Sequence, residues 1–401
     1  MRFKFVSFLT IAAICISCNS KDDIIAENVE NAKVQVGSLL EASEAGDTLR
    51  IPSTFKDGEI EFVPVDDWVS GFFAGTLWYM YELTGDEYWA EHAQKHTEAL
   101  DEIQYLTWHH DVGFMVYDSY GNGLRLKGID AYRDVLVNTA ASLSTRFRPE
   151  AGVLQSWNTD RGWQAERGWT CPVIIDNMMN LELLFNVSEM TGDQRFRDIA
   201  VSHADKTLEN HYRPDFSTYH VVDYDLCTGA VLGRCTAQGY SDDSAWARGQ
   251  AWSIYGFTVA YRFTGDQKYL DRAENVAAYL FSHPAMPEDL VPYWDFDAPD
   301  IPDACKDVSS AAIIASALYE LSYLADNAGY KETADKIVES LSGPAYRAEQ
   351  GTNGGFILMH SVGSIPHGSN VDVPLNYADY YFLEALVRKG RIENGLAPVE
   401  K

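Results

Sequence analysis

The sequence predicts an all-α protein in which six helical hairpins form a toroid, an inner ring of helices enclosed by an outer ring: an (α/α)6 barrel. Three observations predict this fold. The tripeptide Thr-Gly-Asp recurs at Thr84, Thr191 and Thr264. An apolar segment precedes each copy, and an amphipathic, more charged segment follows each copy. Such a repeat indicates a helical unit that buries its apolar surface against its neighbours.

The apolar segments are predicted to be the inner helices. Trp68 to Leu83, Ile175 to Met190 and Arg248 to Phe263 align without gaps on the following Thr-Gly-Asp. A helix that is apolar on all sides is buried, and small residues such as Gly75 and Gly256 permit close helix packing. The glycine of each repeat stands where a helix C-cap is needed. Each repeat therefore marks the end of a buried helix.

The segments after the repeats, such as Glu87 to Ile103, are predicted to be outer, solvent-facing helices. Asn327-Ala-Gly-Tyr330 resembles a degenerate fourth repeat, and the long interval between Thr84 and Thr191 leaves room for one further unit. We expect about six inner helices, the remaining three being placed at residues 131–147, 309–326 and 377–388. Six units suit a closed ring, and an open helical solenoid is the competing architecture.

The N-terminus has the features of an export signal. Arg2 and Lys4 precede an apolar run that is too short to span a membrane. Cys18 follows Ile16-Ser17 as in a bacterial lipoprotein cleavage box, although Cys15 stands where leucine is usual. We expect residues 1–17 to be a signal peptide, 18–35 a lipoprotein tether and 36–401 one (α/α)6 domain. Lipidation of Cys18 makes this an exported lipoprotein of the periplasm or outer membrane. An ordinary secretory signal is the alternative.

The charge and the cysteines exclude some partners. The net charge of −28 argues against nucleic acid, whereas a local cluster of arginine and histidine can still bind a carboxylate. None of the four cysteines beyond the signal has the spacing of metal ligands; they are Cys171, Cys227, Cys235 and Cys305. A Cys227–Cys235 disulfide across a hairpin is possible in an oxidising compartment, but we favour buried free thiols. No metal site is predicted.

The repeat also predicts where a functional site lies. Trp68, Asp176 and Arg248 stand at the first or second position of their aligned helices, so parallel inner helices bring them to one mouth of the ring. The long loops that open on this mouth carry His109-His110-Asp111, Ser217-Thr-Tyr-His220 and Pro292-Tyr-Trp-Asp295. Paired carboxylates among aromatic residues suggest carbohydrate chemistry.

Each carboxylate also has a possible structural role. Asp176 is placed to cap its helix, but the apolar residues 172–175 before it indicate a buried side chain. Asp111 is either a turn residue, a metal ligand or a catalytic group. The side chains of the adjacent His109, His110 and Asp111 diverge, which argues against a shared metal ion.

Arg248 and Trp252 can likewise have either a substrate-binding or a structural role. Ala245, Trp246 and Ala247 indicate that Arg248 is buried, and a buried arginine needs an anionic partner. That partner is either a substrate carboxylate or a structural aspartate. Trp252 lies four residues on, on the same helix face, and is either a substrate contact or a core residue.

Together these motifs resemble the unsaturated glucuronyl hydrolases of glycoside hydrolase family 88, over roughly residues 60–390. The resemblance is carried by His110-Asp111-Val-Gly-Phe-Met, Ile175-Asp176-Asn-Met-Met-Asn180, Arg248-Gly-Gln-Ala-Trp252 and Asp379-Tyr-Tyr-Phe-Leu-Glu-Ala385. Each motif is weak alone, and the set is specific. The resemblance implies a catalytic (α/α)6 domain.

The resemblance also implies a site and a reaction. Asp176 matches the general acid and base, and Asp111 an assisting carboxylate; the matching sugar-site residues are His220, Gln238, Arg248, Trp252, Trp68 and His110. Which of Trp157, Trp163 and Trp169 lines the site stays open. The implied substrate is a glycosaminoglycan fragment that a lyase has left with a 4,5-unsaturated uronic acid at its non-reducing end. No metal or organic cofactor is implied.

Two classes of alternative function remain. One is another enzyme on this toroid, either an unsaturated rhamnogalacturonyl hydrolase or another (α/α)6 glycosidase. The other is a non-catalytic glycan-binding lipoprotein, which would have no need of an aspartate pair beside an arginine and histidine site. The sequence leaves open which glycosaminoglycan is used, its sulfation, the membrane face and the oligomeric state.

Overall fold

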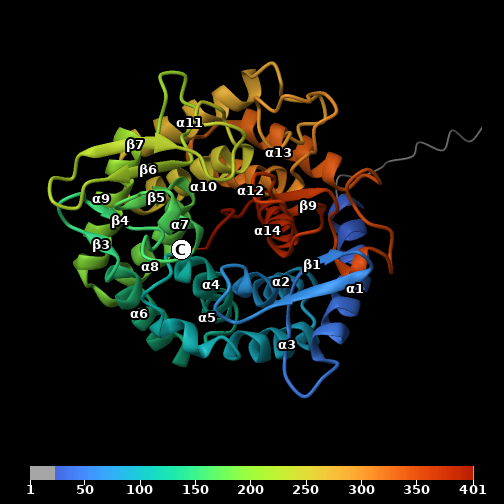
Figure 1. Cartoon of the computed structure of the whole chain (residues 1–401). Helices are drawn as coiled ribbons and strands as arrows, with labels where there is room; N and C mark the ends of the chain where they lie inside the picture. The colour runs from blue at the N-terminus through green and yellow to red at the C-terminus, as the bar shows by residue number, and fades with distance from the viewer. Residues whose placement is uncertain (1–22, 401) are drawn as a thin grey trace, which may run out of the picture.

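A computed structural model describes residues 23–400, and the predicted signal peptide and Cys18 lie outside this range. Within it, helices alternate between an inner and an outer ring (Figure 1). Four inner helices are continuous and two are composite. The inner positions are α2 (Ser70–Thr84), α4 (Val112–Val116) continued by a π-helical turn (Tyr117–Gly121) and α5 (Asn122–Lys127), the 3₁₀ turn η3 (Ile175–Asn180) continued by α8 (Leu181–Thr191), α10 (Ala247–Thr264), α12 (Val308–Leu324) and α14 (Asn376–Glu393).

The outer ring encloses these helices, and each outer helix except the first follows its inner partner through a short turn. The outer helices are α1 (Asp23–Glu44), α3 (Glu87–Glu98), α6 (Ala131–Ser144), α9 (Gln194–Asn210), α11 (Gln267–Ser282) and α13 (Ala328–Leu341). Since an outer helix that runs back separates each inner helix from the next, the inner helices are parallel to one another. Their N-terminal ends therefore share one mouth of the ring.

The ring is closed, because the last inner helix α14 packs against the first inner helix α2. In Figure 1 the red C-terminal helix lies beside the blue N-terminal segments. The prediction of a closed (α/α)6 barrel is therefore confirmed, and the open solenoid is excluded.

One inner helix was predicted in the wrong place. Residues 131–147, expected to supply an inner helix, form the outer helix α6. The inner helix of that unit is residues 112–127, which begins directly after Asp111. A π-helical turn interrupts it, and it ends at Lys127-Gly128 without a Thr-Gly-Asp, so the repeat did not reveal it.

Residues 23–35, expected to belong to a tether, are part of the barrel. They form the first half of α1, which buries Val29, Ala32 and Val36 against α2 and the C-terminal part of the chain. The spacing of three and four residues between these side chains places them on one face of the helix. Only the stretch before Asp23 remains for a tether, and it lies outside the described residues.

The Thr-Gly-Asp repeats are the turns that join inner to outer helices. Gly85, Gly192 and Gly265 cap the inner helices at φ of 67°, 77° and 67°, a conformation that glycine adopts without steric cost. The aspartate that follows caps the outer helix: for example, Asp193 accepts a hydrogen bond from the Arg195 N–H. One tripeptide thus ends one helix and starts the next.

Short antiparallel strands occur in the long loops. They are β1 (Ile51–Lys56) with β2 (Glu59–Val63), β3 (Phe147–Arg148) with β4 (Val153–Leu154), β8 (Ser361–Ser364) with β9 (Ser369–Val373), and the sheet β5 (Pro172–Ile174), β6 (Val221–Tyr224) and β7 (Val231–Cys235) in the order β5-β6-β7. The sheet β5-β6-β7 positions the site, because β5 leads into Asp176 and β6 follows His220.

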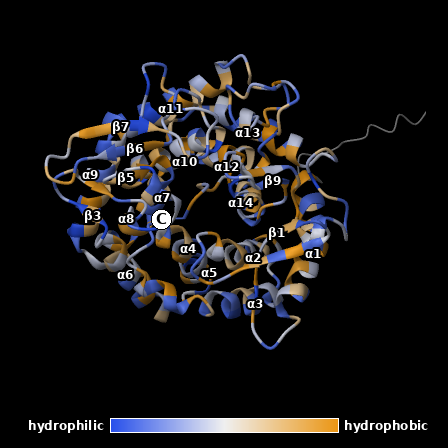
Figure 2. Ribbon diagram, viewed as in Figure 1, coloured by the Kyte–Doolittle hydropathy of each residue, from blue (hydrophilic) through white to orange (hydrophobic). Residues whose placement is uncertain are grey.

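Apolar side chains fill the space between the two rings, and hydrophilic residues gather along the outer helices (Figure 2). Among the described residues, no helix has the length and apolar content needed to cross a membrane. The four cysteines in this range are free thiols, and Cys171 is buried whereas Cys227 is exposed. The preference for free thiols over a Cys227–Cys235 disulfide is confirmed, but burial holds only for some of them.

Candidate active site

Two carboxyl groups lie at the mouth of the ring, on neighbouring inner helices. Asp111 is the N-cap residue of α4, and Asp176 is the second residue of η3. These two helix starts pack against each other. The predicted catalytic pair is therefore brought together by the fold, although 65 positions separate Asp111 from Asp176 in the sequence.

Asp176 is largely buried, with 14% of its side chain exposed, and it is poised to carry a proton. Its Oδ2 atom has no hydrogen-bond partner among residues 23–400. Burial raises its pKa to about 7, against the positive charge of Arg248 and the indole N–H of Trp252, which lower it. A carboxyl group that titrates near neutral pH suits general acid–base catalysis. The N-cap residue of η3 is Ile174 and not Asp176, so Asp176 does not hold the capping position that its place in the sequence suggested.

His220 faces Asp176, with its Nε2 atom 3.8 Å from Asp176 Oδ2. Its Nδ1 atom accepts hydrogen bonds from the backbone N–H groups of Ala237 at 3.0 Å and Gln238 at 3.2 Å. The ring hydrogen must then sit on Nε2. Burial and the charge of Arg248 lower the pKa of His220 well below its usual range. His220 is thus a neutral imidazole that presents an N–H toward Asp176.

Asp111 is held from two sides. Its Oδ1 atom accepts a hydrogen bond of 3.2 Å from the Asn180 amide, and its Oδ2 atom lies 3.2 Å from His110 Nε2. Burial and the neighbouring charge of Asp176 raise its pKa to about 8, whereas the Asn180 hydrogen bond lowers it. Because two buried carboxylates do not both ionise easily at close range, the pair retains a proton at neutral pH.

Arg248 is buried, as expected, and its anionic partner in the structure is Asp307. Arg248 Nη1 lies 3.1 Å from Asp307 Oδ2 and also donates to the Val362 carbonyl, and Nη2 donates to the Gly363 carbonyl at 2.6 Å. The structural aspartate that the sequence left as an alternative is therefore present. A direct contact of Arg248 with a substrate carboxylate stays a prediction.

The predicted aromatic contacts divide into buried and accessible residues. Trp252 is fully buried, with ring centroids 5.3 Å from Phe114 and 5.5 Å from Tyr381, so its ring is a core residue and not an exposed platform for a sugar. Trp68 is half-buried and packs 5.0 Å from Tyr377. The Gln238 side chain donates to the Gly363 carbonyl at 3.3 Å, beside Arg248.

A cavity of about 270 Å³ opens at Asp111, the member of the carboxyl pair that lines it. Trp68, His110 and Asp111 line it together with Trp108, His109, Ser156, Trp157, Asn158, Arg161 and Gln164. Of the three tryptophans left open by the sequence, Trp157 is the one in the wall. Trp163 and Trp169 pack against it at 5.1 and 5.6 Å, and Trp157 also lies 5.9 Å from His220. The wall is thus a stacked aromatic cluster.

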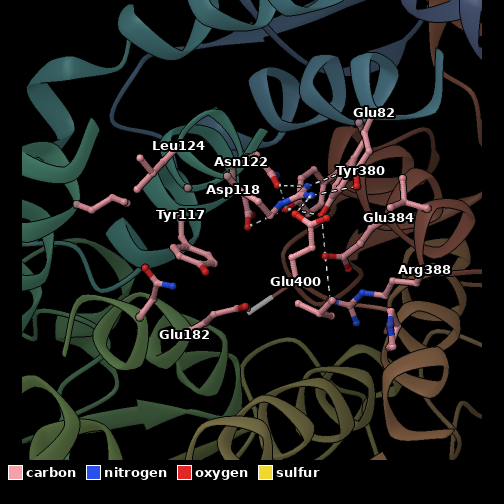
Figure 3. A pocket seen from close by; sticks show the side chains of 18 of the residues that line it. Glu82, Tyr117, Asp118, Asn122, Leu124, Glu182, Tyr380, Glu384, Arg388 and Glu400 are labelled. Atoms are coloured by element: carbon pink, nitrogen blue, oxygen red, sulfur yellow. Dashed lines mark hydrogen bonds and ion pairs between the residues drawn. The ribbon is translucent and has the colours of Figure 1, made fainter. Parts of the chain in front are cut away.

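A larger cavity of about 350 Å³ lies elsewhere inside the ring and lacks the carboxyl pair (Figure 3). Residues from the later turns of the inner helices line it, including Tyr117, Asp118, Glu182, Tyr380 and Glu384, with Glu400 of the C-terminal segment. Most of its charges are paired internally; Arg388, for example, contacts Glu384 at 3.1 Å. We therefore place the chemistry in the smaller cavity, at the N-terminal ends of the inner helices.

Comparisons with known proteins agree with this site. The model of Glycosyl Hydrolase Family 88 matches residues 48–384. An unsaturated glucuronyl hydrolase from Formosa agariphila is 44% identical over 82% of this chain and 81% of its own length. One from a Bacillus species is 35% identical over 84% of this chain and 90% of its own.

Solved structures agree as well. The crystal structure of an unsaturated glucuronyl hydrolase specific for heparin matches with a TM-score of 0.89 and 44% identity, covering 93% of this chain and 98% of that one. The family model matches most of the sequence, and both the similar enzymes and the solved structures agree with it. This chain is therefore a glycoside hydrolase that belongs to glycoside hydrolase family 88.

Proposed function

We propose that this enzyme removes a 4,5-unsaturated uronic acid from the non-reducing end of lyase-generated glycosaminoglycan oligosaccharides. The observation that carries the proposal is Asp176, a buried carboxyl group with a pKa of about 7 that faces the neutral His220. Similar proteins are named unsaturated glucuronyl hydrolase and unsaturated chondroitin disaccharide hydrolase, which supports the substrate class.

The reaction follows from the chemistry of the substrate, whose C4=C5 bond is part of a vinyl ether. Asp176 donates its proton to C4, which leaves an oxocarbenium-like centre at C5 and an Asp176 carboxylate. Water adds to C5 and gives a proton back to Asp176. The resulting hemiketal opens, and the remaining saccharide is released. No attack at the anomeric carbon is needed, so the distinction between retaining and inverting enzymes does not apply.

The surrounding residues serve these steps. The His220 N–H faces the carboxylate that forms when Asp176 gives up its proton, so it stabilises that charge. Asp111 polarises the same region, and the Trp157 cluster supplies an aromatic wall for the sugars. Arg248, Gln238, Trp68 and His110 are proposed to bind the uronate and its neighbour.

The proposal is tested by loss of the ultraviolet absorbance of the conjugated double bond. Unsaturated disaccharides of the heparin, chondroitin and hyaluronan types form the first set, because one similar enzyme is specific for heparin and others act, by name, on chondroitin disaccharides. An unsaturated rhamnogalacturonan disaccharide and a saturated glucuronide form the second set. Activity only on the second set, or binding without turnover, would overturn the proposal.

We further propose that the enzyme is an exported lipoprotein, anchored through Cys18. The support is the N-terminal sequence alone: a short positive start, an apolar run and a cysteine before a polar stretch. Cys18→Ala is expected to move the protein from the membrane to the soluble fraction. Cys15→Ala, a matched change within the apolar run, is expected to leave it in the membrane. Unchanged fractionation of the Cys18 variant would rule out this anchor.

A further inference from the structure

The N-cap residue of α4 does not cap its helix through its side chain. Asp130 and Asn180 likewise hold the N-cap positions of α6 and α8 without a side-chain capping bond. In five other helices of the described range, the aspartate or asparagine at the N-cap accepts a hydrogen bond from the N–H two residues on; these cap residues are Asp86, Asp193, Asp266, Asp307 and Asn327. Asp111 occupies the same position on α4, but its carboxyl group makes no capping bond. An aspartate normally satisfies a free N–H at this position, so another group must do so here.

Asn180 supplies that group from the neighbouring inner helix. Its Oδ1 atom accepts a hydrogen bond of 2.9 Å from the backbone N–H of Phe114, in the first turn of α4. Its Nδ2 atom donates to Asp111 Oδ1 at 3.2 Å. Since a backbone N–H can only donate, the orientation of the Asn180 amide is fixed. Its NH₂ group must therefore face Asp111.

The close fit of the two helix starts makes this arrangement possible. A Cβ atom on Gly113 would lie 2.5 Å from Asn180 Oδ1 and 2.7 Å from Asn180 Cα. No residue larger than glycine fits there without a shift. This contact explains why glycine follows Asp111 by two positions, and it joins the His110-Asp111-Val-Gly-Phe segment to the Asp176-Asn-Met-Met-Asn180 segment.

We infer that Asn180 is a positioning residue, which caps α4 in place of Asp111 and thereby frees and aims the Asp111 carboxyl group for catalysis. Because Asp111 Oδ1 must accept from the Asn180 amide, a proton on Asp111 sits on Oδ2, the atom 3.2 Å from His110 Nε2. Asn180 thus decides which oxygen of Asp111 takes part in proton exchange.

The neighbouring Asn177 is also buried but bonds elsewhere. It donates to the Leu154 carbonyl at 2.7 Å, and its Oδ1 atom has no hydrogen-bond partner among residues 23–400. The other charged and titratable groups that act on Asp111 are Asp176, Arg146, Asp67 and His109. Of the two asparagines that follow Asp176 in this motif, Asn180 is therefore the one that holds Asp111.

The inference rests on the proposed function, and Asn180→Asp tests it. Below the pKa of the new carboxyl group, its O–H can donate to Asp111 while its C=O accepts from Phe114, as the amide does. Once ionised, it cannot donate, and it repels Asp111. We expect kcat to fall by about 10–100-fold at pH 8, as displacements of catalytic groups do, with KM within about threefold and the deficit shrinking as pH falls to 5.

The matched control is Asn31→Asp. Like Asn180, Asn31 is a buried asparagine whose amide group donates a hydrogen bond. It donates to the backbone carbonyl of Ala348 at 3.0 Å, and it lies on the outer helix α1, away from the carboxyl pair. This variant is expected to keep wild-type kcat at every pH where circular dichroism shows it folded. Asn180→Ser provides a second test. The serine side chain fits the site, but its single hydroxyl is too short to bond to both the Phe114 N–H and Asp111 Oδ1. We expect this variant to lower kcat at all pH values.

The outcomes separate the two proposals. A wild-type enzyme that does not consume unsaturated disaccharides refutes the proposed function. An active wild type whose folded Asn180→Asp variant has unchanged kcat, or a deficit that is the same at pH 5 and pH 8, overturns the positioning role. Failure of both Asn180 variants to fold at pH 5 also overturns it, since Asn180 would then be a structural residue.

Discussion

At the scale of single residues, Asp176 combines burial, a raised pKa and a free oxygen atom. Asp176→Asn keeps the size of the side chain but removes the proton that must reach C4. We expect turnover to fall by about 10⁴-fold or more, the upper end for general acid–base catalysis, because one group serves both steps. The loss of substrate absorbance measures this change. A folded variant that keeps more than a tenth of wild-type activity would contradict the mechanism.

Arg248 and Asp307 form a buried ion pair that a double-variant experiment can dissect. Arg248→Ala is expected to raise KM, with a binding cost of about 1.5–3 kcal/mol if it contacts the uronate. It also leaves Asp307 unpaired, which costs about 3–5 kcal/mol of stability. Adding Asp307→Asn is expected to recover stability but not KM. Recovery of KM in the double variant would make Arg248 purely structural.

At the scale of helices and turns, the Thr-Gly-Asp junctions affect stability and not chemistry. Gly192→Ala places a Cβ on a residue at φ 77° and is expected to cost about 1 kcal/mol in free energy of unfolding. Urea denaturation measures the cost, and kcat and KM are expected to be unchanged, since the turn lies at the end of α8 away from Asp176. A change in KM would mean that the outer turns influence the site.

These junctions are also what made the barrel predictable from sequence. Three repeats located three hairpins, because both helix ends of each junction are capped locally and so leave a local signal. The helix at 112–127 has no such junction: a π-helical turn breaks it, and its start is capped by Asn180 from another helix. The spacing of the apolar residues in α1 is that of an amphipathic helix. The polar, acidic residues at its start are equally typical of a tether, and they led to the wrong prediction for residues 23–35.

The site was predictable in part for the same reason. Asp111, Asp176 and His110 lie in motifs at helix starts, and His220 lies directly before strand β6. These four residues do come together. The partner of Arg248, in contrast, is 59 positions away at the start of the next inner helix, and only the packing of α10 against α12 determines that contact. Asn180 stands in one of the motifs that carry the resemblance, but its role depends on a tertiary contact with α4.

At the scale of the whole molecule, the carboxyl pair makes stability depend on pH. The folded state raises the pKa of Asp176 to about 7 and of Asp111 to about 8, from an ordinary value of 3.8. The folded protein therefore prefers the protonated forms. Their contribution to stability is fully present below about pH 4 and is lost as pH rises toward 8.

Asp176→Asn removes the ionisable group, so the variant should become more stable than the wild type as pH rises. We expect its Tm to match that of the wild type near pH 4 and to exceed it by about 2–4 °C or more at pH 8, because each kcal/mol is worth a few degrees. Thermal melts followed by circular dichroism measure the difference. The exposed Asp134→Asn on α6 serves as the control, and its Tm offset should be equal at both pH values. A stabilisation by Asp176→Asn that is independent of pH would argue against a buried ionisable group.

The parallel inner helices have an electrostatic consequence for an enzyme whose net charge is −28. Six peptide macrodipoles direct their positive ends, each equivalent to about half an elementary charge, at the mouth where an anionic sugar would enter. The outer helices run antiparallel to the inner ones, so their dipoles cancel this field far from the protein. Close to the first turn of each inner helix, the field remains. Added salt therefore screens the long-range repulsion of the acidic surface more than the short-range attraction of the helix ends. For a sulfated, uronate-terminated disaccharide, KM should accordingly fall as ionic strength rises, the reverse of what a basic, anion-collecting surface produces.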